Sequence, residues 1–327
     1  MKAVYYEQFG APEVLRVGER PKPEPGPDEV LVQVAAAGVN PIDRRLRNGE
    51  LQGFFSREWP IVPGWDVAGR VVAVGSQVSG WQKGEDIVGL AFTWNLHHGT
   101  YAEFVPVKAA SIARKPKELS FDTAAALPLV SLTAWESLAE YANLQRGQTV
   151  LIQAGAGGLG SVAISIARHL GATIYTTARK ENFNYVRSRG ADHVIDYTRC
   201  DYVKVMKEHE PQGVDAVLES LTGEGIAEAA IALVKSGGTV AYMNNEPPEL
   251  AEIASRNIRT KFLHHRPDGE SLARLMRLYE SGAIALPPVE VMPLHMAAQA
   301  HRKSESGRTR GKVVLHVQHI EEAVCVD

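Results

Sequence analysis

The sequence predicts an α/β protein in which a mostly-β domain is interrupted by an inserted, doubly wound parallel sheet. Three observations indicate this fold class. The first third of the chain is rich in β-type segments separated by closely spaced glycines and prolines. From Gln148 onward, apolar strand-like runs alternate with helix-like segments, as in βαβ units. The last apolar segment, residues 311–317, is strand-like again and needs a strand to pair with.

The N-terminal part is expected to form a small, mostly antiparallel barrel. Residues 30–34 alternate around Gln33, and residues 70–74 are β-branched and bounded by glycines. Turn residues recur from Pro25-Gly26-Pro27 to Gly89, so the strands between them must be short.

The middle of the chain carries the parallel sheet. Residues 122–141 have helical apolar spacing that is interrupted at Pro128. Residues 149–153 form an unbroken apolar run, which is typical of a central parallel strand covered on both faces. Further strands are expected at 173–177, 194–195, 214–218 and 239–243, and helices at 161–170, 181–188, 223–234 and 249–256.

The C-terminal tail is expected to return to the first domain. It contains two helix candidates, residues 271–279 and 294–304, and then the strand at 311–317. Because a lone strand must pair somewhere, this strand should join the N-terminal sheet. The mostly-β domain then comprises residues 1–123 and 266–327, and the inserted domain residues 124–265.

Composition excludes several classes of protein. The net charge of −3 carries no block of like charges, so it favours neither a nucleic acid nor an anionic membrane as partner. No apolar run approaches the roughly 20 residues that span a bilayer, and the first ten residues lack the apolar core of a signal peptide. Two cysteines, Cys200 and Cys325, cannot build a disulfide framework or a cysteine zinc site. A reducing cytoplasm is the expected location.

A glycine turn follows the first strand of the expected parallel sheet. Gly155, Gly157 and Gly160 have the G-x-G-x-x-G spacing, between a strong strand and a helix. In such a turn the first glycine allows the tight bend, the second lets the backbone approach a pyrophosphate, and the third lets helix and strand pack closely. The backbone N–H groups at the helix start, including those of Gly158 and Leu159, then bind phosphate. The alternative is a plain turn without a ligand.

The end of the second strand distinguishes between the two nicotinamide cofactors. NAD sites place an acidic residue about 20 positions after the glycine turn, but here no acid precedes Glu181. Arg179 and Lys180 stand there instead and are suited to a 2′-phosphate. The sequence therefore favours NADPH, against the alternative that both cations are solvated loop charges.

Several segments together resemble the medium-chain dehydrogenase/reductase superfamily, in its zinc-free quinone oxidoreductase (zeta-crystallin-like) branch. The segments that carry the resemblance lie at residues 36–49, 62–75, 99–104, 124–138, 150–160 and 190–197. The resemblance implies a GroES-like catalytic domain around an inserted Rossmann domain. It also implies NADPH-dependent reduction of a carbonyl, an enone or a quinone, and by analogy a homodimer joined through sheet edges of the nucleotide domains.

The zinc enzymes of that superfamily provide a test for a metal. Their catalytic zinc ligands match Asn40, Trp65 and, by a rougher gapped match, Leu129, none of which is a thiolate or imidazole ligand. The four-cysteine structural zinc lobe is also missing. The adjacent pair His97-His98 has no partner at ligand spacing. We therefore expect no metal.

Without zinc, another group must polarise the acceptor oxygen as negative charge develops on it. The resemblance places Asn40 towards the nicotinamide as a donor, with Asp43 orienting it or lining the cleft. Asn40 could equally be a turn residue before Pro41. Bacterial quinone reductases carry tyrosines where this chain has Arg45 and Leu51, so the proton donor is left open between water and a cofactor hydroxyl.

The resemblance suggests further contacts. Thr133 matches a threonine packed near the nicotinamide, and Tyr197 matches a tyrosine beside the adenosine phosphate or is simply a strand-end aromatic. Asn244 should lie at the carboxyl edge of the sheet, where ligands bind. For the substrate, the candidates are Trp65, Trp94 and Asn95, although a loop tryptophan is as often a packing residue.

The sequence thus predicts an NADPH-dependent, zinc-independent oxidoreductase that transfers hydride to a quinone or an α,β-unsaturated carbonyl. Two alternatives stay open: a reductase of saturated aldehydes or ketones, and a non-catalytic NADPH-binding redox sensor or structural protein. The physiological acceptor, the proton donor and the choice between one- and two-electron reduction are not predicted.

Overall fold

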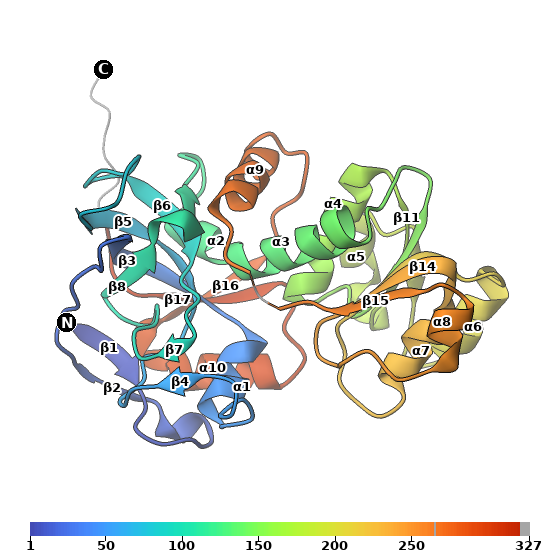
Figure 1. Ribbon diagram of the computed structural model, residues 1–327, viewed down its shortest axis with the longest axis horizontal. Helices are drawn as coiled ribbons and strands as arrows, with labels where there is room; N and C mark the ends of the chain where they lie inside the picture. Colours follow the sequence, from blue (N-terminus) through green and yellow to red (C-terminus); the bar gives the residue numbers. More distant parts are fainter. Residues whose placement is uncertain (265, 321–327) are drawn as a thin grey trace. The chain divides into compact units, whose positions relative to one another are not determined.

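The computed structural model describes residues 1–264 and 266–320, which form two compact units (Figure 1). One unit contains Met1–Leu129, Arg266–Glu280 and the chain from Pro288 onward. The other contains Val130–His265 and Ser281–Pro287. The second unit is therefore inserted into the first. Its bounds differ from those expected from the sequence, because residues 124–129 belong to the first unit and Ser281–Pro287 to the second.

The first unit is built around one sheet of seven strands, six of them in the order β16-β17-β3-β5-β6-β9, with β8 also paired to β3. The strands are β3 (Glu29–Val39), β5 (Asp66–Val74), β6 (Asp86–Leu90), β8 (Phe104–Lys108), β9 (Ile112–Arg114), β16 (Val289–Pro293) and β17 (Lys312–His316). All pairings are antiparallel except that of β16 with β17. The expected mostly antiparallel pairing is confirmed, whereas within residues 1–264 and 266–320 no strand pairing joins β16 to β9 to close the expected barrel.

The returning tail strand is confirmed in particular. In β17, Val313 lies opposite Val39 of β3, and His316 lies opposite Ala36. β3 pairs with three strands because it is long: β8 pairs with its residues 29–33 and β17 with its residues 36–39 along one edge, and β5 pairs along the other. The pairing holds residues 312–316 beside the end of β3, where α1 (Pro41–Arg47) begins.

Smaller elements complete the first unit. They are the two-stranded pairs β1 (Lys2–Tyr5) with β2 (Arg16–Glu19) and β4 (Ser56–Arg57) with β7 (Asn95–Leu96), and the helices α2 (Phe121–Ala125), α9 (Gly269–Glu280) and α10 (Ala297–Glu305).

The helix expected at 122–141 begins as α2, restarts as α3 (Pro128–Trp135) and ends in a π-helical segment, Glu136–Tyr141. Pro128 starts a helix rather than ending one, because the first turn of a helix needs no N–H from that residue.

The second unit contains a six-stranded parallel sheet in the order β12-β11-β10-β13-β14-β15. The strands are β10 (Thr149–Ile152), β11 (Thr173–Thr177), β12 (His193–Ile195), β13 (Val214–Glu219), β14 (Val234–Tyr242) and β15 (Arg259–Phe262). Numbered along the chain, this is the spatial order 3-2-1-4-5-6 of dinucleotide-binding sheets, in which the strand order reverses beside the first strand.

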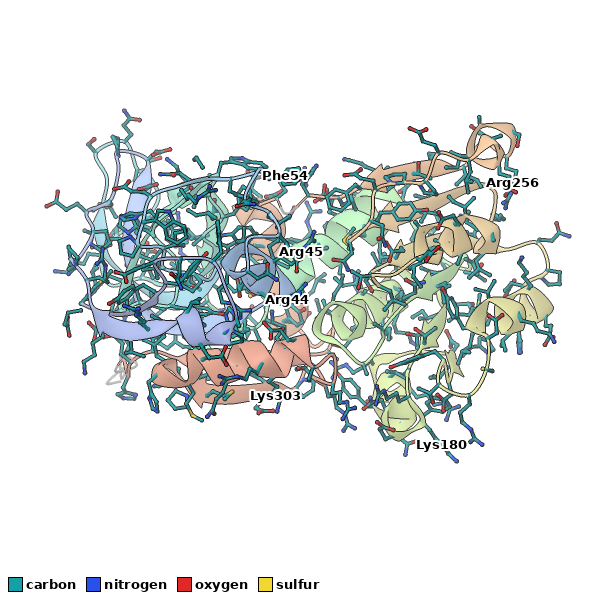
Figure 2. All side chains as sticks on the ribbon, turned by 90° about the horizontal axis from the view of Figure 1, so that it is seen from below. Arg44, Arg45, Phe54, Lys180, Arg256 and Lys303 are labelled. Atoms are coloured by element: carbon teal, nitrogen blue, oxygen red, sulfur yellow. The ribbon has the colours of Figure 1, made fainter. Side chains whose placement is uncertain are left out.

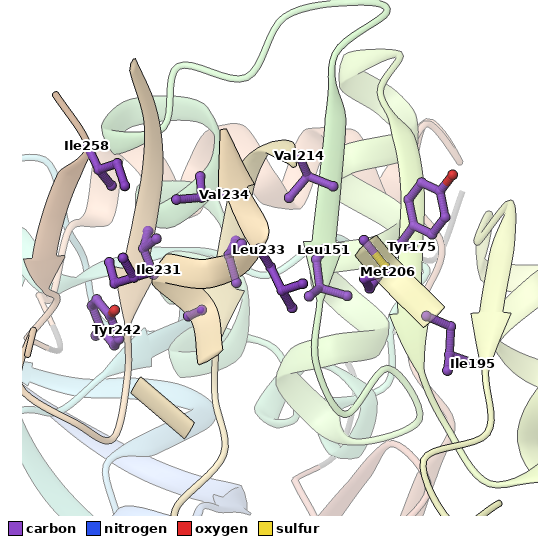
Figure 3. Close-up of a cluster of buried hydrophobic side chains, with 13 residues drawn as sticks. Leu151, Tyr175, Ile195, Met206, Val214, Ile231, Leu233, Val234, Tyr242 and Ile258 are labelled. Atoms are coloured by element: carbon purple, nitrogen blue, oxygen red, sulfur yellow. The ribbon is translucent and has the colours of Figure 1, made fainter. Parts of the chain in front are cut away.

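Helices cover this sheet: α4 (Gly158–Leu170), α5 (Phe183–Arg189), α6 (Tyr202–His209), α7 (Ile226–Leu233) and α8 (Ala251–Ser255). On one face, side chains of α6 and α7 pack against the strands (Figure 3). Met206 and Ile231 are buried there together with Leu151 and Val217 of the central strands. Burial on both faces explains why residues 150–152 are apolar without alternation.

No helix within the described residues is both long enough and apolar enough to cross a membrane. Cys200 is exposed and unpaired, and Cys325 lies outside the described residues.

Candidate functional site

The glycine turn joins β10 to α4, and two of its glycines are required by packing. A Cβ atom on Gly155 would lie 2.1 Å from the Thr176 hydroxyl oxygen. A Cβ atom on Gly160 would lie 2.3 Å from the carbonyl oxygen of Ala154. Both distances are far below van der Waals contact, so only glycine lets the helix start this close to the strand. Close packing is the role that the sequence assigns to the third glycine, Gly160; for Gly155, to which it assigns the tight bend, the demand comes from packing against Thr176 of β11.

Gly157 is different, because no neighbouring protein atom lies close enough to exclude a larger side chain at this position. A Cβ atom on Gly157 would have Ala154 O, at 3.4 Å, as its nearest neighbour. Gly157 is also the N-cap of α4 and offers no side chain to the free N–H groups of the first turn. A space beside an uncapped helix start fits the phosphates of a dinucleotide.

The glycine turn lies where the strand order of the parallel sheet reverses. β10 has β11 on one side and β13 on the other. At the carboxyl end of β13, Asn244 Nδ2 donates to Ser220 O at 2.7 Å. Asn244 therefore lies at the predicted carboxyl edge of the sheet. Its side chain connects the loop after β14 to the loop after β13.

Sequence reasoning missed Glu219, the last residue of β13. Its side chain is fully buried and accepts hydrogen bonds from Leu221 N at 2.7 Å and Asn245 Nδ2 at 3.0 Å. Burial raises the pKa of this carboxyl to about 7. An acid directly after the apolar run Ala216–Leu218 was the available signal.

The structure brings two of the predicted cofactor residues together beyond the end of β11. Arg179 Nε donates to the Tyr197 hydroxyl oxygen at 3.1 Å, and Tyr197 is 45% exposed. Lys180, next along the chain, is also exposed (Figure 2). Two cations and a phenol at one exposed strand end form an anion-attracting surface.

Thr133 lies in α3 and is nearly buried. Its carbonyl oxygen accepts from the Ser137 hydroxyl at 2.6 Å, at the point where α3 passes into the π-helical segment.

The first unit contains a buried network of one amide, one carboxylate and one ammonium group. Asn40 Nδ2 donates to Asp66 Oδ2 at 2.8 Å. Lys312 Nζ donates to the amide oxygen of Asn40 and, at 3.3 Å, to Asp66 Oδ2. None of the three is more than 3% exposed. Asn40 is therefore held through both of its amide heteroatoms.

Asp43 holds the backbone on the other side of Asn40. Its Oδ2 atom accepts from Asn40 N at 2.8 Å and from the Tyr101 hydroxyl at 3.0 Å. Complete burial raises the pKa of this carboxyl to about 7. Asp43 therefore orients the predicted catalytic residue.

This geometry restricts what Asn40 can do. An amide nitrogen carries two hydrogens, and Asp66 accepts one of them. A single N–H is left for a substrate oxygen. The predicted role of Asn40 as a donor stays a prediction, and it now depends on that one N–H.

The predicted substrate residues Trp65 and Trp94 belong to one aromatic cluster. Trp65 is 3% exposed and Trp94 59% exposed. Two rings that the sequence did not single out, Phe55 and Phe92, connect them. Asn95 is exposed, and its side-chain oxygen accepts from the Ser56 hydroxyl at 3.1 Å.

Comparison with known proteins supplies the family. Residues 26–117 match the family model of the alcohol dehydrogenase GroES-like domain, and residues 189–315 match that of zinc-binding dehydrogenases. The chain is 36% identical to the 2-methylene-furan-3-one reductase of Solanum lycopersicum, covering 97% of this chain and 79% of the relative. The chain belongs to the medium-chain dehydrogenase/reductase superfamily, in its quinone oxidoreductase branch.

Other members of the superfamily agree with this placement. The NADPH-dependent alkenal/one oxidoreductase of Arabidopsis thaliana is 33% identical over the same shares of the two chains. The structure of Escherichia coli quinone oxidoreductase, determined with NADPH, aligns with a TM-score of 0.87 and 26% identity, covering 97% of this chain and all of that one.

Two of the three positions that the sequence comparison matched to zinc ligands, Asn40 and Leu129, bind one carboxylate, that of Asp66. Asp66 Oδ2 accepts from Asn40, and Asp66 Oδ1 accepts from Leu129 N at 2.8 Å. Trp65 precedes Asp66 in the chain. Across residues 1–264 and 266–320, no group of three His, Cys, Asp or Glu side chains is arranged to hold a metal ion. His97 Nδ1 donates a hydrogen bond to the carbonyl oxygen of Glu58 at 2.9 Å.

Proposed function

We propose that this protein is an NADPH-dependent reductase of quinones or α,β-unsaturated carbonyls. When bound, NADPH supplies the hydride, and one proton completes the reduction of the acceptor. The observation that carries the proposal is the glycine turn, where Gly157 borders space at the uncapped start of α4. The relatives named as enone and quinone reductases supply the acceptor class.

We assign cofactor binding to residues of the second unit. The backbone from Gly155 to Gly160, including Gly158 and Leu159, binds the pyrophosphate through N–H groups. Arg179, Lys180 and Tyr197 bind the 2′-phosphate. Thr133 and Asn244 complete the proposed contacts. In this assignment the second unit is the cofactor-binding domain and the first unit is the catalytic domain.

We assign polarisation of the acceptor oxygen to the remaining N–H of Asn40. Lys312 and Asp66 hold its side chain, and Asp43 holds its backbone. Such fixed donors stabilise developing negative charge without having to reorganise during the reaction. We further propose that Trp65, Trp94 and Asn95 contact the substrate, and that the reaction requires no zinc.

We also propose a cytoplasmic homodimer. The parallel sheet offers two edge strands, β12 and β15, each paired on one side only within the described chain. Edge strands of this kind can pair with a second copy of the same sheet. The location follows from the two-cysteine composition.

The cofactor assignment is tested by replacing Arg179 and Lys180 together with alanine. We expect the Kd for NADPH to rise by roughly 10- to 100-fold, because charge-assisted hydrogen bonds contribute about 1.5–3 kcal/mol. The Kd for NADH should change little. Both constants are measured by quenching of protein fluorescence.

The matched control is Lys207→Ala, which removes an exposed lysine of α6. It should leave both constants unchanged. An equal weakening of NADPH and NADH in the double variant would show that the 2′-phosphate is not read at Arg179 and Lys180.

A further inference from the structure

The strand β13 carries a carboxylate near each end, and the two differ in what surrounds them. Asp215, near the amino end, forms an ion pair with Lys235. Glu219, at the carboxyl end, is fully buried and accepts hydrogen bonds from Leu221 N at 2.7 Å and Asn245 Nδ2 at 3.0 Å. Both donors are neutral groups. In the part of the chain that the structure describes, Glu219 therefore has no counter-ion.

A buried carboxylate that is held by neutral groups alone is unfavourable for a fold. The two N–H donors of Glu219 satisfy its oxygen atoms, but they do not balance its negative charge. Burial accordingly raises the pKa of this carboxyl to about 7. Titratable groups with such shifts gather at functional sites. We therefore look for the missing positive charge in a ligand that binds near the end of β13.

The end of β13 lies on one particular side of the proposed cofactor site. In the sheet, β11 and β12 lie on one side of β10, and β13 and β14 lie on the other. A dinucleotide crosses such an edge with its pyrophosphate at the glycine turn. Arg179 and Lys180 follow β11 and are assigned to the 2′-phosphate of the adenosine half. The nicotinamide half therefore extends over the ends of β13 and β14.

Hydrogen bonds connect the surroundings of Glu219 to the glycine turn. The next residue, Ser220, donates from its backbone N to Gln153 Oε1 and from its hydroxyl to the Gln153 carbonyl oxygen, both at 3.3 Å. Gln153 lies two positions before Gly155. Asn245, which donates to Glu219, lies in the loop after β14. The carboxylate is thus part of the structure that holds the loops on the nicotinamide side.

The nicotinamide ring changes its charge in the proposed reaction. Hydride leaves the ring with both electrons of its C–H bond and joins the acceptor, a proton completes the reduction of the acceptor, and the ring keeps one positive charge. The reduced ring is neutral. A negative charge on this side of the site therefore attracts NADP⁺ more strongly than NADPH. A fixed charge that faces charge developing in a reaction also lowers its barrier.

We propose that the carboxylate of Glu219 balances the positive charge of the oxidised nicotinamide ring, which strengthens the binding of NADP⁺ relative to NADPH and favours hydride transfer to the acceptor. The inference rests on the proposed reductase function and adds an electrostatic role to its cofactor site. The charge acts only while the carboxyl is ionised, so the effect depends on pH.

Two titratable side chains among the described residues interact with the charge of Glu219: Tyr202 at the start of α6 and Tyr242 of β14. Burial, and then the carboxylate of Glu219, raise the pKa of both phenols, so both stay neutral. Asp201 lies beside Tyr202, and Glu228 of α7 faces Tyr242. These two acids have the same sign of charge as Glu219. None of the four groups therefore supplies the missing positive charge.

The test compares the two oxidation states of the cofactor in Glu219→Gln, a variant of the same shape without the charge. The Kd values for NADP⁺ and NADPH are measured by isothermal titration calorimetry without an acceptor, so that no turnover occurs. At about pH 8, the ratio of the Kd for NADP⁺ to the Kd for NADPH should rise roughly fivefold, the scale of one partly screened interaction between two charges. A purely structural role of Glu219 would weaken both cofactors alike and leave this ratio unchanged.

The wild-type protein provides a second readout that needs no variant. Lowering the pH from about 8 to about 6 crosses the pKa of Glu219, which is about 7, and neutralises the carboxyl. The wild-type ratio should therefore rise toward that of Glu219→Gln, whose own ratio should stay constant. The 2′-phosphate titrates in both cofactors, so its effect cancels in the ratio. This readout decides the proposal if Glu219→Gln does not fold.

Asp215→Asn is the matched control, because it removes a carboxylate from the other end of the same strand. It should leave the ratio unchanged. Three results would overturn the proposal: a wild-type ratio in Glu219→Gln at about pH 8, a wild-type ratio that does not change with pH, and an equal change in Asp215→Asn.

The same measurements separate this inference from the reductase function. If the wild-type protein binds both cofactors but reduces no acceptor, the reductase function fails and the Kd ratios still decide the role of Glu219. If it reduces acceptors but its Kd ratio responds neither to Glu219→Gln nor to pH, only the inference about Glu219 fails.

Discussion

The ammonium group of Lys312 is buried in the protein interior. Its side chain is 4% exposed, and Asp66, 3.3 Å away, is fully buried. Two opposite charges in the interior tolerate burial only when each satisfies the other and the remaining polar atoms are also bonded. Asn40 provides those further bonds, accepting from Lys312 and donating to Asp66. The proposed catalytic amide is thus part of the charge compensation.

Lys312→Met is expected to lower the free energy of unfolding by about 3–5 kcal/mol, because it leaves the carboxylate of Asp66 buried without its counter-ion. Urea unfolding measures the loss. Lys303→Met is the control: Lys303 lies in α10, is partly exposed and pairs with Glu290 (Figure 2). A surface ion pair of this kind contributes about 1 kcal/mol or less.

Adding Asp66→Asn to Lys312→Met should recover part of the lost stability, since the uncompensated charge is then removed. A Lys312→Met variant that loses no more than Lys303→Met would contradict the buried network as the source of stability.

At the residue scale, the sequence could indicate Asn40 and Asp43 but not the residues that hold them. Asn40 and Asp43 are three positions apart and meet through a helix start. Lys312 lies 272 positions from Asn40 and 246 from Asp66, so no local pattern connects them. Arg179 and Tyr197 were both named, but their hydrogen bond depends on β11 and β12 ending side by side.

At the scale of elements, the turn between β10 and α4 separates structural from ligand-binding glycines. Gly160→Ala should destabilise the fold by about 1–3 kcal/mol, because its methyl group would overlap the Ala154 carbonyl. Gly157→Ala should cost less than about 1 kcal/mol, since its Cβ atom would meet only an ordinary contact at 3.4 Å.

Stability should be lowered more by Gly160→Ala, whereas affinity for NADPH should be lowered more by Gly157→Ala. Gly157→Ala should bind NADPH roughly tenfold or more weakly, because its methyl group occupies the space needed for close backbone approach. Thermal unfolding and fluorescence titration measure the two effects. Normal NADPH affinity in a well-folded Gly157→Ala variant would rule out pyrophosphate binding at this turn.

Elements with a strong local pattern were predicted well. β11 occupies the expected residues 173–177, and α9 differs from its expected bounds by only two positions at one end and one at the other. The strand β15, with charged residues at two of its four positions, and the strand β16, with three exposed residues, lack the apolar run that a buried strand shows. β14 begins at Val234, five residues earlier than expected, because it pairs with β13 across two glycines that weaken the strand pattern.

At the scale of the whole molecule, the insertion explains why the sequence shows two kinds of pattern, β-rich at its ends and alternating strand and helix in its middle. The C-terminal segment completes the sheet of the first unit. Its strand β17 pairs with β3 although the whole parallel sheet lies between them in the sequence. The fold class and the superfamily were predictable because both depend on patterns repeated along the chain. The contacts among Phe55, Trp65, Phe92 and Trp94 were not, because these rings come from three separate loop regions that only the fold brings together.

We propose that this protein catalyses NADPH-dependent reduction without zinc. The most direct measurement is steady-state NADPH oxidation by EDTA-treated, metal-analysed protein, with a panel of quinones and enones and identification of the products. We predict saturable NADPH oxidation that is unaffected by EDTA, without stoichiometric zinc, yielding hydroquinones or saturated ketones. Tight NADPH binding with no turnover of any acceptor, or activity that is lost with EDTA and restored by zinc, would contradict it.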